Sequence, residues 1–208
     1  MFGLAVKANR RIAKVLNFGI AYGMTEMGVR DNLNKEADPA LGIEIVTTEE
    51  AAAHLAKWHS LYPGVQGYIA WLVNTMCRTR PPSFTNIFGR TRRIPWVRSH
   101  GAEGRRGARQ AIASMVQGTA NELMKVSMVR VDAEILAPLR ASGVPAWISG
   151  NVHDEMWIDC PREYAPDVAR RAKPIMEDFR QLHPIPVKAN GEWTQTTWAD
   201  KADIWTSA

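Results

Sequence analysis

The stretch RRIAKVLNFGIAYG, residues 10–23, decides how this sequence is interpreted. Arg10, Lys14 and Phe18 are spaced four residues apart, so on a helix they share one face. Tyr22 follows one turn later, rotated by about 80° from Lys14 at about 100° per residue. Such a face could hold a triphosphate at its cationic end and stack a base or sugar at its aromatic end. The alternative from spacing alone is an ordinary amphipathic helix with ordinary Lys and Arg side chains.

A second polar group, VHDE at residues 152–155, lies inside a strand-like stretch. Its adjacent carboxylates could ligate a hard cation such as Mg²⁺, which prefers oxygen ligands and keeps several waters. The alternative is a polar turn between two strands. Composition alone places that turn at Ser149-Gly150-Asn151.

The charge is unevenly distributed along the chain. Lys and Arg outnumber Asp and Glu by 26 to 21 overall, but between residues 90 and 109 seven arginines accompany a single acid, Glu103. A second basic group near the start consists of Lys7, Arg10, Arg11 and Lys14. Because the planar arginine fork suits phosphate oxygens, the pattern favours a nucleic-acid partner over a merely solvated face.

Size and residue usage set the broad class of the protein. A chain of 208 residues can form one sizeable core or two small lobes. Its two cysteines indicate neither a disulfide framework nor a zinc site. The sequence has no secretory signal pattern and no run of about 20 apolar residues that could span a membrane. We therefore expect a cytoplasmic protein, or one in the host cytoplasm if it is phage-encoded, without a membrane partner.

The spacing of apolar residues predicts an α+β fold with a helix-rich first half and a mixed second half. Helices are predicted over residues 7–18, 24–34, 49–60, 65–78, 107–137 and 163–182. A hairpin is predicted at about residues 84–96, strands within 144–160, and a last strand over 184–189. The longest helix is expected to bury a stripe formed by Ile112, Met115, Val116, Leu123, Met124 and Met128.

Residues 10–23 closely resemble motif B of the family A DNA polymerases, the bacterial DNA polymerase I type. The family pattern is Arg, three residues, Lys, three residues, Phe or Tyr, Gly, two residues, Tyr, Gly, and the sequence meets it at each fixed position. The resemblance implies that Arg10 and Lys14 bind the phosphates of the incoming nucleotide, with Lys14 also catalytic. It further implies that Phe18 packs on the sugar and base, and that Tyr22 lies beside the template base and the nascent pair.

The His-Asp-Glu string at residues 153–155 resembles motif C of the same family, which forms a hairpin in the palm. This resemblance places the turn at His153-Asp154. It implies that Asp154 binds both catalytic Mg²⁺ ions, that Glu155 has a supporting catalytic role beside them, and that His153 contacts the primer terminus.

The segment between the two motifs also resembles the family. Phe88–Pro95 is similar to its Gly-Arg-Arg hairpin, and Ala108–Ala120 is similar to its long palm helix. The resemblance implies DNA contacts by Arg90, Arg109 and Gln117. One position departs from the family pattern, because Ala113 stands where the family has Asn.

Together these likenesses imply a partial polymerase right hand. Its fingers-like subdomain would be residues 1–100, with the motif B helix at 7–23 and the hairpin, and its palm-like subdomain residues 101–208. Motif A, which supplies a second metal-binding aspartate, is not found in the sequence. We therefore expect a partner polypeptide or upstream segment that carries motif A, the thumb and the exonuclease.

The expected activity is that of a DNA-directed DNA polymerase: two-metal nucleotidyl transfer of dNTPs to a primer 3′ end on primer–template DNA. One alternative is a non-catalytic remnant that binds DNA or nucleotides. A further alternative is a metal-dependent hydrolase that uses residues 153–155 and has no need of Arg10 or Lys14.

Overall fold

The computed structural model describes residues 7–35, 37, 45–180 and 185–204, and within this range the side chains of residues 7–12, 15 and 198 are left out of the description. The chain forms two compact units, Met1–Thr85 with Thr91–Met115, and Asn86–Arg90 with Val116–Ala208. The fold is α+β, as predicted, with three two-stranded antiparallel sheets among the described residues.

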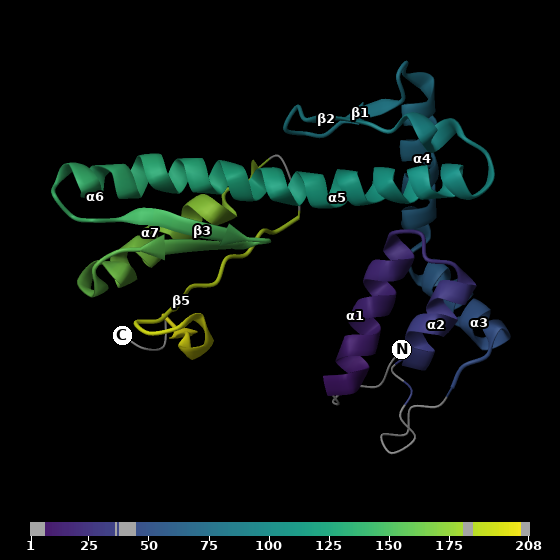
Figure 1. Cartoon of the computed structure of the whole chain (residues 1–208), viewed down its shortest axis with the longest axis horizontal. Helices are drawn as coiled ribbons and strands as arrows, with labels where there is room; N and C mark the ends of the chain where they lie inside the picture. Colours follow the sequence, from purple (N-terminus) through teal and green to yellow (C-terminus); the bar gives the residue numbers. More distant parts are fainter. Residues whose placement is uncertain (1–6, 36, 38–44, 181–184, 205–208) are drawn as a thin grey trace. The chain divides into compact units, whose positions relative to one another are not determined.

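The first unit opens with three helices that pack around one core (Figure 1). They are α1 (Lys7–Ala21), α2 (Glu26–Lys35) and α3 (Thr48–Leu61). The helix α3 starts at a capping box, in which the Thr47 hydroxyl accepts from the Glu50 N–H and the Glu50 carboxylate accepts from the Thr47 N–H. The buried members of this core are Leu16, Ile20, Val29, Leu33 and Ala51.

A second core of the first unit lies where the helix α4 meets a short hairpin. The elements are α4 (Pro63–Arg78), β1 (Ser83–Thr85), β2 (Thr91–Arg93), the 3₁₀ helix η2 (Pro95–Arg98) and the first turns of α5 (Gly101–Val131). The hairpin confirms the one predicted near residues 84–96, with Phe84 opposite Arg92. The buried residues are Leu72, Met76, Phe84, Ile94, Val97, Ala111 and Ile112.

The second unit is built on the later part of α5. The helix continues through a π-helical turn, Asp132–Leu136, into α6 (Ala137–Ala141). The strands β3 (Trp147–Val152) and β4 (Glu155–Asp159) form a hairpin that lies beside α7 (Ala165–Glu177) in Figure 1. The 3₁₀ helix η4 (Arg162–Tyr164) precedes α7. The core consists of Val131, Ile135, Leu136, Ala146, Val168, Ala172 and Ile175.

Two short strands and a 3₁₀ turn end the described chain. The strand β5 (Glu192–Trp193) pairs with β6 (Ala202–Asp203), and η6 (Trp198–Asp200) lies between them. The 3₁₀ turn is closed by Asp200, whose carboxylate accepts from the hydroxyls of Thr196 and Thr197.

Several sequence-based expectations need correction. The longest helix begins at Gly101 rather than at residue 107, and Val116 within it is 47% exposed instead of joining a buried stripe. The reason is that the two ends of α5 belong to different cores, so no single stripe serves its whole length. No strand forms over the described residues 185–189, where the sequence led us to expect one.

The predicted helix over residues 163–182 is also shorter than expected. It is divided into η4 and α7, and α7 ends at Glu177. The Glu177 side chain also positions a later part of the chain, because its carboxylate accepts a hydrogen bond from the Ala189 N–H at 2.9 Å. The chain after α7 is thus fixed by a side-chain contact instead of by strand pairing.

Candidate functional site

The helix α1 displays the predicted nucleotide-binding residues because its opposite face is buried. Leu16 and Ile20 are 4% and 2% exposed and pack into the core with α2 and α3. At the edge of this core, the Trp58 indole donates to the Asn17 side chain at 2.7 Å and connects α3 to α1. An added Cβ at Gly19 would lie 2.0 Å from the terminal methyl of Met24, so a larger residue here would require the flexible Met24 side chain to move.

The front of α1 carries a cation followed by two rings. Lys14 is exposed, and Phe18 is 56% exposed. The Phe18 and Tyr22 rings are stacked, with centroids 6.5 Å apart and planes 16° apart. Tyr22 is half-buried against the second core of the same unit, so it is a fixed support for the more exposed ring of Phe18. Arg10 lies in the same helix, but its side chain is outside the described ones.

The end of α1 brings in one residue that is distant in the sequence. Gly23 has φ +84°, a backbone conformation that favours glycine. A Cβ placed there would lie 3.4 Å from Cγ of Arg109, so the Arg109 side chain passes directly over this turn. The structure thereby brings Arg109 next to the Tyr22-Gly23 pair, within the first unit.

In the second unit, the acidic string forms the tip of the β3–β4 hairpin. Val152 pairs with Glu155, which leaves His153 and Asp154 as the two turn residues. The turn at residues 149–151 that composition favoured is therefore wrong, and the position implied by the motif is confirmed. His153 has φ +54°, which is uncommon for a residue other than glycine. Both His153 and Asp154 are exposed.

The two adjacent carboxylates have different surroundings. The Asp154 carboxylate makes no hydrogen bond or ion pair with another described residue. The Glu155 carboxylate lies 3.3 Å from Nζ of Lys201, whose ammonium is also 2.6 Å from the Glu192 carboxylate. The hydrogen bond to Glu192 raises the pKa of Lys201, burial opposes it, and the bond to Glu155 adds to it. No described residue therefore engages the Asp154 carboxylate, whereas one of the two Glu155 oxygens is paired with Lys201.

The fit of a divalent cation to these residues is partial. Carboxylate oxygens are the ligands that Mg²⁺ prefers, and Asp154 is accessible to one. Within the described ranges, no three His, Cys, Asp or Glu side chains gather as a metal centre. At this turn the described residues thus provide the exposed Asp154 carboxylate and the partly exposed Glu155 carboxylate, which are not a complete ligand set.

The other two predicted DNA-binding residues lie in the second unit. The Arg90 guanidinium pairs with the Glu122 carboxylate, which Lys125 also approaches at 3.3 Å. Burial alone would raise the pKa of Glu122, but hydrogen bonds from Lys125 and Arg90 outweigh it and hold that pKa below the ordinary value. Arg90 keeps a 57% exposed side chain, so some of its donors face solvent. Gln117 is exposed on α5.

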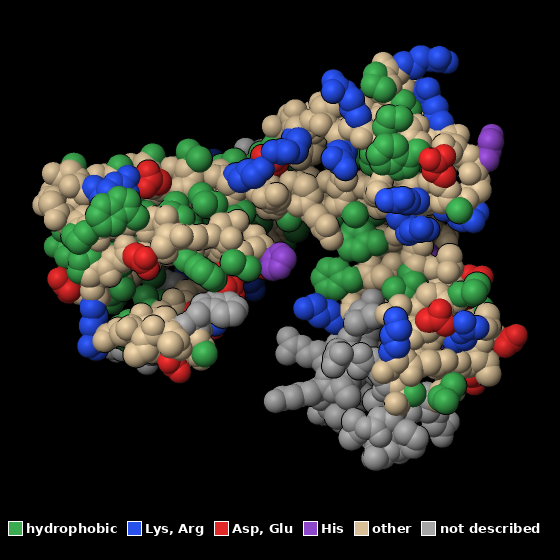
Figure 2. Space-filling view, in the orientation of Figure 1, with side chains coloured by type: hydrophobic (Ala, Val, Ile, Leu, Met, Phe, Trp, Pro, Cys, Tyr) green, Lys and Arg blue, Asp and Glu red, His purple; other side chains and the backbone are tan. Residues whose placement is uncertain are grey.

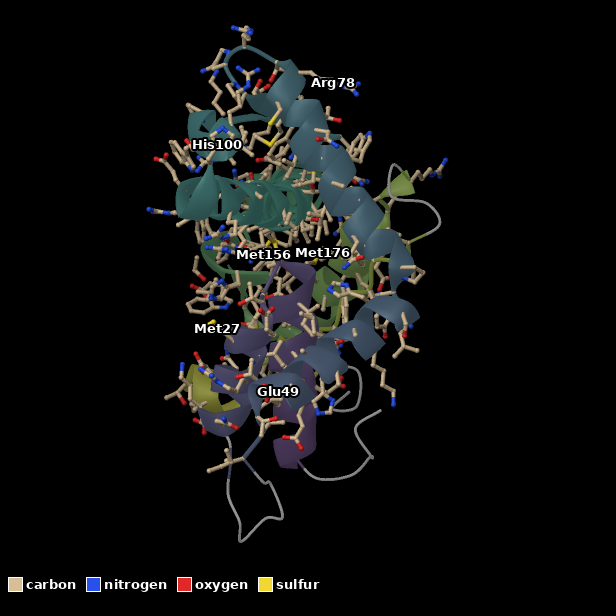
Figure 3. All side chains as sticks on the ribbon, turned by 90° about the vertical axis from the view of Figure 1, so that its right-hand side faces the viewer. Met27, Glu49, Arg78, His100, Met156 and Met176 are labelled. Carbon is tan, nitrogen blue, oxygen red and sulfur yellow. The ribbon has the colours of Figure 1, made fainter. Side chains whose placement is uncertain are left out.

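The arginine-rich part of the first unit presents most of its charge to solvent. Lys and Arg side chains crowd the surface around β1–β2 and the start of α5 in Figure 2, and Arg78 lies at the end of α4 in Figure 3. Arg98 differs, because it donates to the carbonyls of Cys77 and Thr79 and so has a structural role. Besides Arg98 and Arg109, the exposed arginines of this surface are Arg78, Arg80, Arg92, Arg93, Arg105 and Arg106.

Sequence reasoning missed Lys201, Arg78 and Arg80. The separation of 46 residues between Lys201 and Glu155 left no local signal for their contact. Arg78 and Arg80 stand outside the arginine cluster that begins at residue 90, although as arginines they could have been included among the candidate phosphate-binding residues.

None of the helices in the described ranges has the length and apolar character needed to cross a membrane.

The chain is similar to known DNA polymerases over most of its length. The family model described as DNA polymerase family A matches residues 3–200. The chain is 31% identical to DNA polymerase I of Pseudomonas aeruginosa over 183 residues, which are 86% of this chain and 18% of that protein. It is 34% identical to the thermostable DNA polymerase I of Thermus aquaticus over 188 residues, or 88% of this chain and 20% of that protein.

A solved structure shows the same fold. The POL domain of Pol1 from M. smegmatis, in complex with DNA primer-template and dNTP, has a TM-score of 0.70 and 22% identity, and the match covers 88% of this chain and 29% of that one. The chain thus spans about a fifth of the length of the curated relatives described above. Since the family model matches nearly all of it, the chain belongs to DNA polymerase family A.

Proposed function

We propose that this chain is the fingers and palm portion of a DNA-directed DNA polymerase, which adds dNTPs to a primer 3′ end on template DNA. The observation that carries the proposal is the exposed face of α1, where Lys14 precedes the stacked Phe18 and Tyr22 rings. The names of the relatives, DNA polymerase I, support it. So does the structural neighbour, a POL domain in complex with DNA primer-template and dNTP.

On the nucleotide side, Lys14 and Arg10 neutralise the triphosphate. A charge-assisted hydrogen bond from an ammonium to a phosphate oxygen is about twice as strong as a neutral one. Phe18 offers its exposed ring to the sugar and base, and Tyr22 supports that ring from behind by stacking. A triphosphate without a base would lose the ring contact, whereas a nucleoside would lose the cations, so both ends are needed for tight binding.

On the metal side, the exposed Asp154 carboxylate would be one of the ligands that hold divalent cations. Two such cations would supply charge stabilisation for the attacking and leaving oxygens of phosphoryl transfer. Glu155 lies at the start of β4 beside the turn, and His153, the other turn residue, contacts the primer terminus in this proposal. Motif A, supplied by an upstream segment or a second polypeptide, completes the carboxylate set.

In this proposal the DNA is contacted by surface residues that have hydrogen-bond donors facing solvent. Arg109 beside Gly23, exposed Gln117 and partly engaged Arg90 supply hydrogen bonds to the primer–template. The exposed arginines of the first unit add a sequence-independent attraction for phosphates, which weakens as salt rises.

The proposal is tested with the purified chain, a labelled primer–template, Mg²⁺ and dNTPs. We compare the wild type with Asp154→Asn and with Asp159→Asn, a matched exposed carboxylate at the far end of the same hairpin. Primer extension that is lost in Asp154→Asn and kept in Asp159→Asn would show a catalytic chain. Magnesium-dependent binding of dNTP and DNA without extension would show a half-site that needs motif A from elsewhere.

The alternative, a non-catalytic remnant that binds nucleotides or DNA, gives a different result in the same assay. It predicts binding that is unchanged by Mg²⁺ and by Asp154→Asn. A chain that binds neither dNTP nor primer–template would overturn both hypotheses.

A further inference from the structure

The helix α4 carries an exposed aromatic pair on the side that faces away from its core. Leu72 and Met76 are fully buried in the second core of the first unit. At about 100° per residue, Trp71 lies about 140° around the helix from Met76, and Tyr68 lies about 60° from Trp71. The centroids of the Tyr68 and Trp71 rings are 5.7 Å apart with planes tilted by 31°, and Trp71 is 56% exposed.

The fold makes little use of this pair. Neither the Trp71 indole N–H nor the Tyr68 hydroxyl forms a hydrogen bond with another described residue. Trp58 of α3 differs, because its indole donates to a side chain of α1. Gly64 and Gly67 lie on the same side of α4 as Trp71, and a Cβ added to either would meet no described atom within 4 Å. The two rings therefore stand on an open helix surface that a ligand can reach.

Positive charge continues the same helix surface. The helix α4 contains no Asp or Glu and ends at Arg78, which is labelled in Figure 3. Arg78 is seven residues from Trp71, or about 10 Å along the axis and about 20° around it. Arg80 is also exposed, and neither guanidinium forms an ion pair or hydrogen bond with another described residue. Arg98 donates to the two carbonyls on either side of Arg78, which fixes the backbone at this end of the helix.

Two rings followed by two cations match the chemistry of an unpaired nucleic-acid strand. Aromatic side chains stack on single-stranded bases with little regard to sequence, because every base has a π face. In a duplex those faces are already stacked on neighbouring bases, so a duplex offers this surface its phosphates alone. Guanidinium groups bind the phosphates of either form.

We propose that the surface formed by Tyr68, Trp71, Arg78 and Arg80, the α4 face, binds single-stranded DNA, with bases on the rings and phosphates on the guanidinium groups. The inference rests on the proposed function for DNA as the polyanion. It goes beyond that function because the α4 face selects unpaired over paired DNA, and because it uses neither the exposed face of α1 nor the acidic turn.

The experiment titrates the full chain into a fluorescently labelled oligothymidylate of about 12 nucleotides and follows anisotropy. A blunt duplex and an abasic strand of the same length are the comparison ligands. Trp71→Ala is expected to weaken oligothymidylate binding by about tenfold and to leave binding of both comparison ligands within about twofold. Trp71→Phe, which keeps a stacking ring, is expected to stay within about threefold of the wild type.

Two results of this titration would overturn the proposal. The first is an equal loss of oligothymidylate and duplex binding in Trp71→Ala. The second is unchanged oligothymidylate binding in Trp71→Ala, which is the result expected if a protein surface covers the α4 face instead. Retained duplex binding shows that the variant is folded.

A salt series separates the rings from the cations. For single strands, each phosphate contact contributes about 0.7 to the slope of log affinity against log salt. Arg78→Met is therefore expected to reduce the slope for oligothymidylate by about 0.7, whereas Trp71→Ala lowers the affinity at every salt concentration and keeps the slope. An unchanged slope in Arg78→Met would remove the phosphate contact from the proposal.

Two control variants test whether the site is specific. Trp147→Ala removes a tryptophan of the second unit that is 53% exposed, and Lys57→Met removes an exposed cation of α3. We expect oligothymidylate binding within about twofold of the wild type in both. A loss in Trp147→Ala as large as that in Trp71→Ala would mean that any exposed tryptophan binds the strand, and it would overturn the proposal.

Binding of a dNTP by the same preparations separates this inference from the proposed function. If the wild type binds dNTP and primer–template but Trp71→Ala leaves oligothymidylate binding unchanged, only the role of the α4 face fails. If the wild type binds neither dNTP nor any DNA, both fail.

Discussion

The helix α1 and the β3–β4 turn display their polar groups by different means. In α1 the helical period determines the display, because Lys14 and Phe18 share the face opposite the buried Leu16 and Ile20. In the turn a single backbone conformation determines it, since His153 at φ +54° reverses the chain and leaves Asp154 exposed at the tip. A helical site therefore depends on many residues that each contribute a little, and a turn site depends on one or two.

The largest effect that tests this comparison is expected on α1. Lys14→Met removes the described cation of the face without removing helix propensity, because both residues are good helix formers. A lost charge-assisted contact of about 1.5–3 kcal/mol predicts dNTP binding that is about 10- to 100-fold weaker. Isothermal titration with a dNTP and with the matching nucleoside checks this.

The nucleoside is the control ligand for Lys14→Met, because it has no phosphates and its binding is expected to be unchanged. Lys57→Met, at an exposed position of α3, is the control variant. Equal weakening of dNTP and nucleoside binding would mean that Lys14 maintains the helix instead of contacting phosphate.

The next largest effect is expected on stability at Gly23, just after α1, where the backbone has a positive φ as it does at His153 in the β3–β4 turn. Gly23→Val places a β-branched residue at φ +84°, which costs about 2 kcal/mol of unfolding free energy. Chemical denaturation measures the loss. Gly118→Val, in mid-helix with no atom within 4 Å of an added Cβ, is the matched control and is expected to change stability far less. Similar losses in both variants would remove the special role of the Gly23 conformation.

A smaller effect is expected at the turn. His153→Val lowers the unfolding free energy by about 1 kcal/mol, because valine tolerates a positive φ less well than histidine. His153→Gly stays within about 0.5 kcal/mol of the wild type, since the relief of strain is offset by the greater freedom of glycine in the unfolded chain. Thermal unfolding compares the two. If glycine destabilises as much as valine, the imidazole and not the backbone determines the turn.

The smallest effect concerns the pH dependence of the unit that carries the turn. Hydrogen bonds from Lys173 and from the Ala189 N–H lower the pKa of Glu177 from its ordinary 4.5. A lowered carboxyl pKa contributes stability that is present above the unfolded pKa and is lost as the pH falls through the folded one. The stability difference between wild type and Glu177→Gln should therefore shrink below about pH 4.5.

Denaturation at a series of pH values checks this, with Glu163→Gln at an exposed position as the control. A difference between wild type and Glu177→Gln that stays constant down to the acid limit would mean that the Glu177 contacts act without regard to its charge.

Spacing along the sequence was sufficient to predict the face of α1, because a helix repeats at a fixed period and residues 10–23 contain that repeat. Composition was not sufficient to locate the turn. It placed the turn at residues 149–151 because of Gly150, but Gly150 lies within β3 against the Trp157 ring. There the motif gave the correct position. Glycine marks both turns and places where a ring packs closely on the backbone, and composition does not distinguish them.

Contacts between distant residues could not be predicted at all. The pairs Lys201 with Glu155 and Arg90 with Glu122 join elements that only the folded chain brings together. The same is true of Arg109 beside Gly23. Each contact uses hydrogen-bonding groups of a predicted site residue that could otherwise bind a ligand. The sequence therefore indicated which residue types form the site, but not which of their donors and acceptors remain free to bind.

The helix α5 contributes to two separate cores, and this affects where recombination between related genes can preserve the fold. Its Ala111 and Ile112 belong to one core and its Val131 to another, so a crossover between two related genes near Met115 would keep both cores whole. The junction must also preserve helical phase. One inserted residue turns one end by about 100° relative to the other, whereas seven return it to within about 20°. Recombination and length variation in this helix are therefore expected to respect whole heptads.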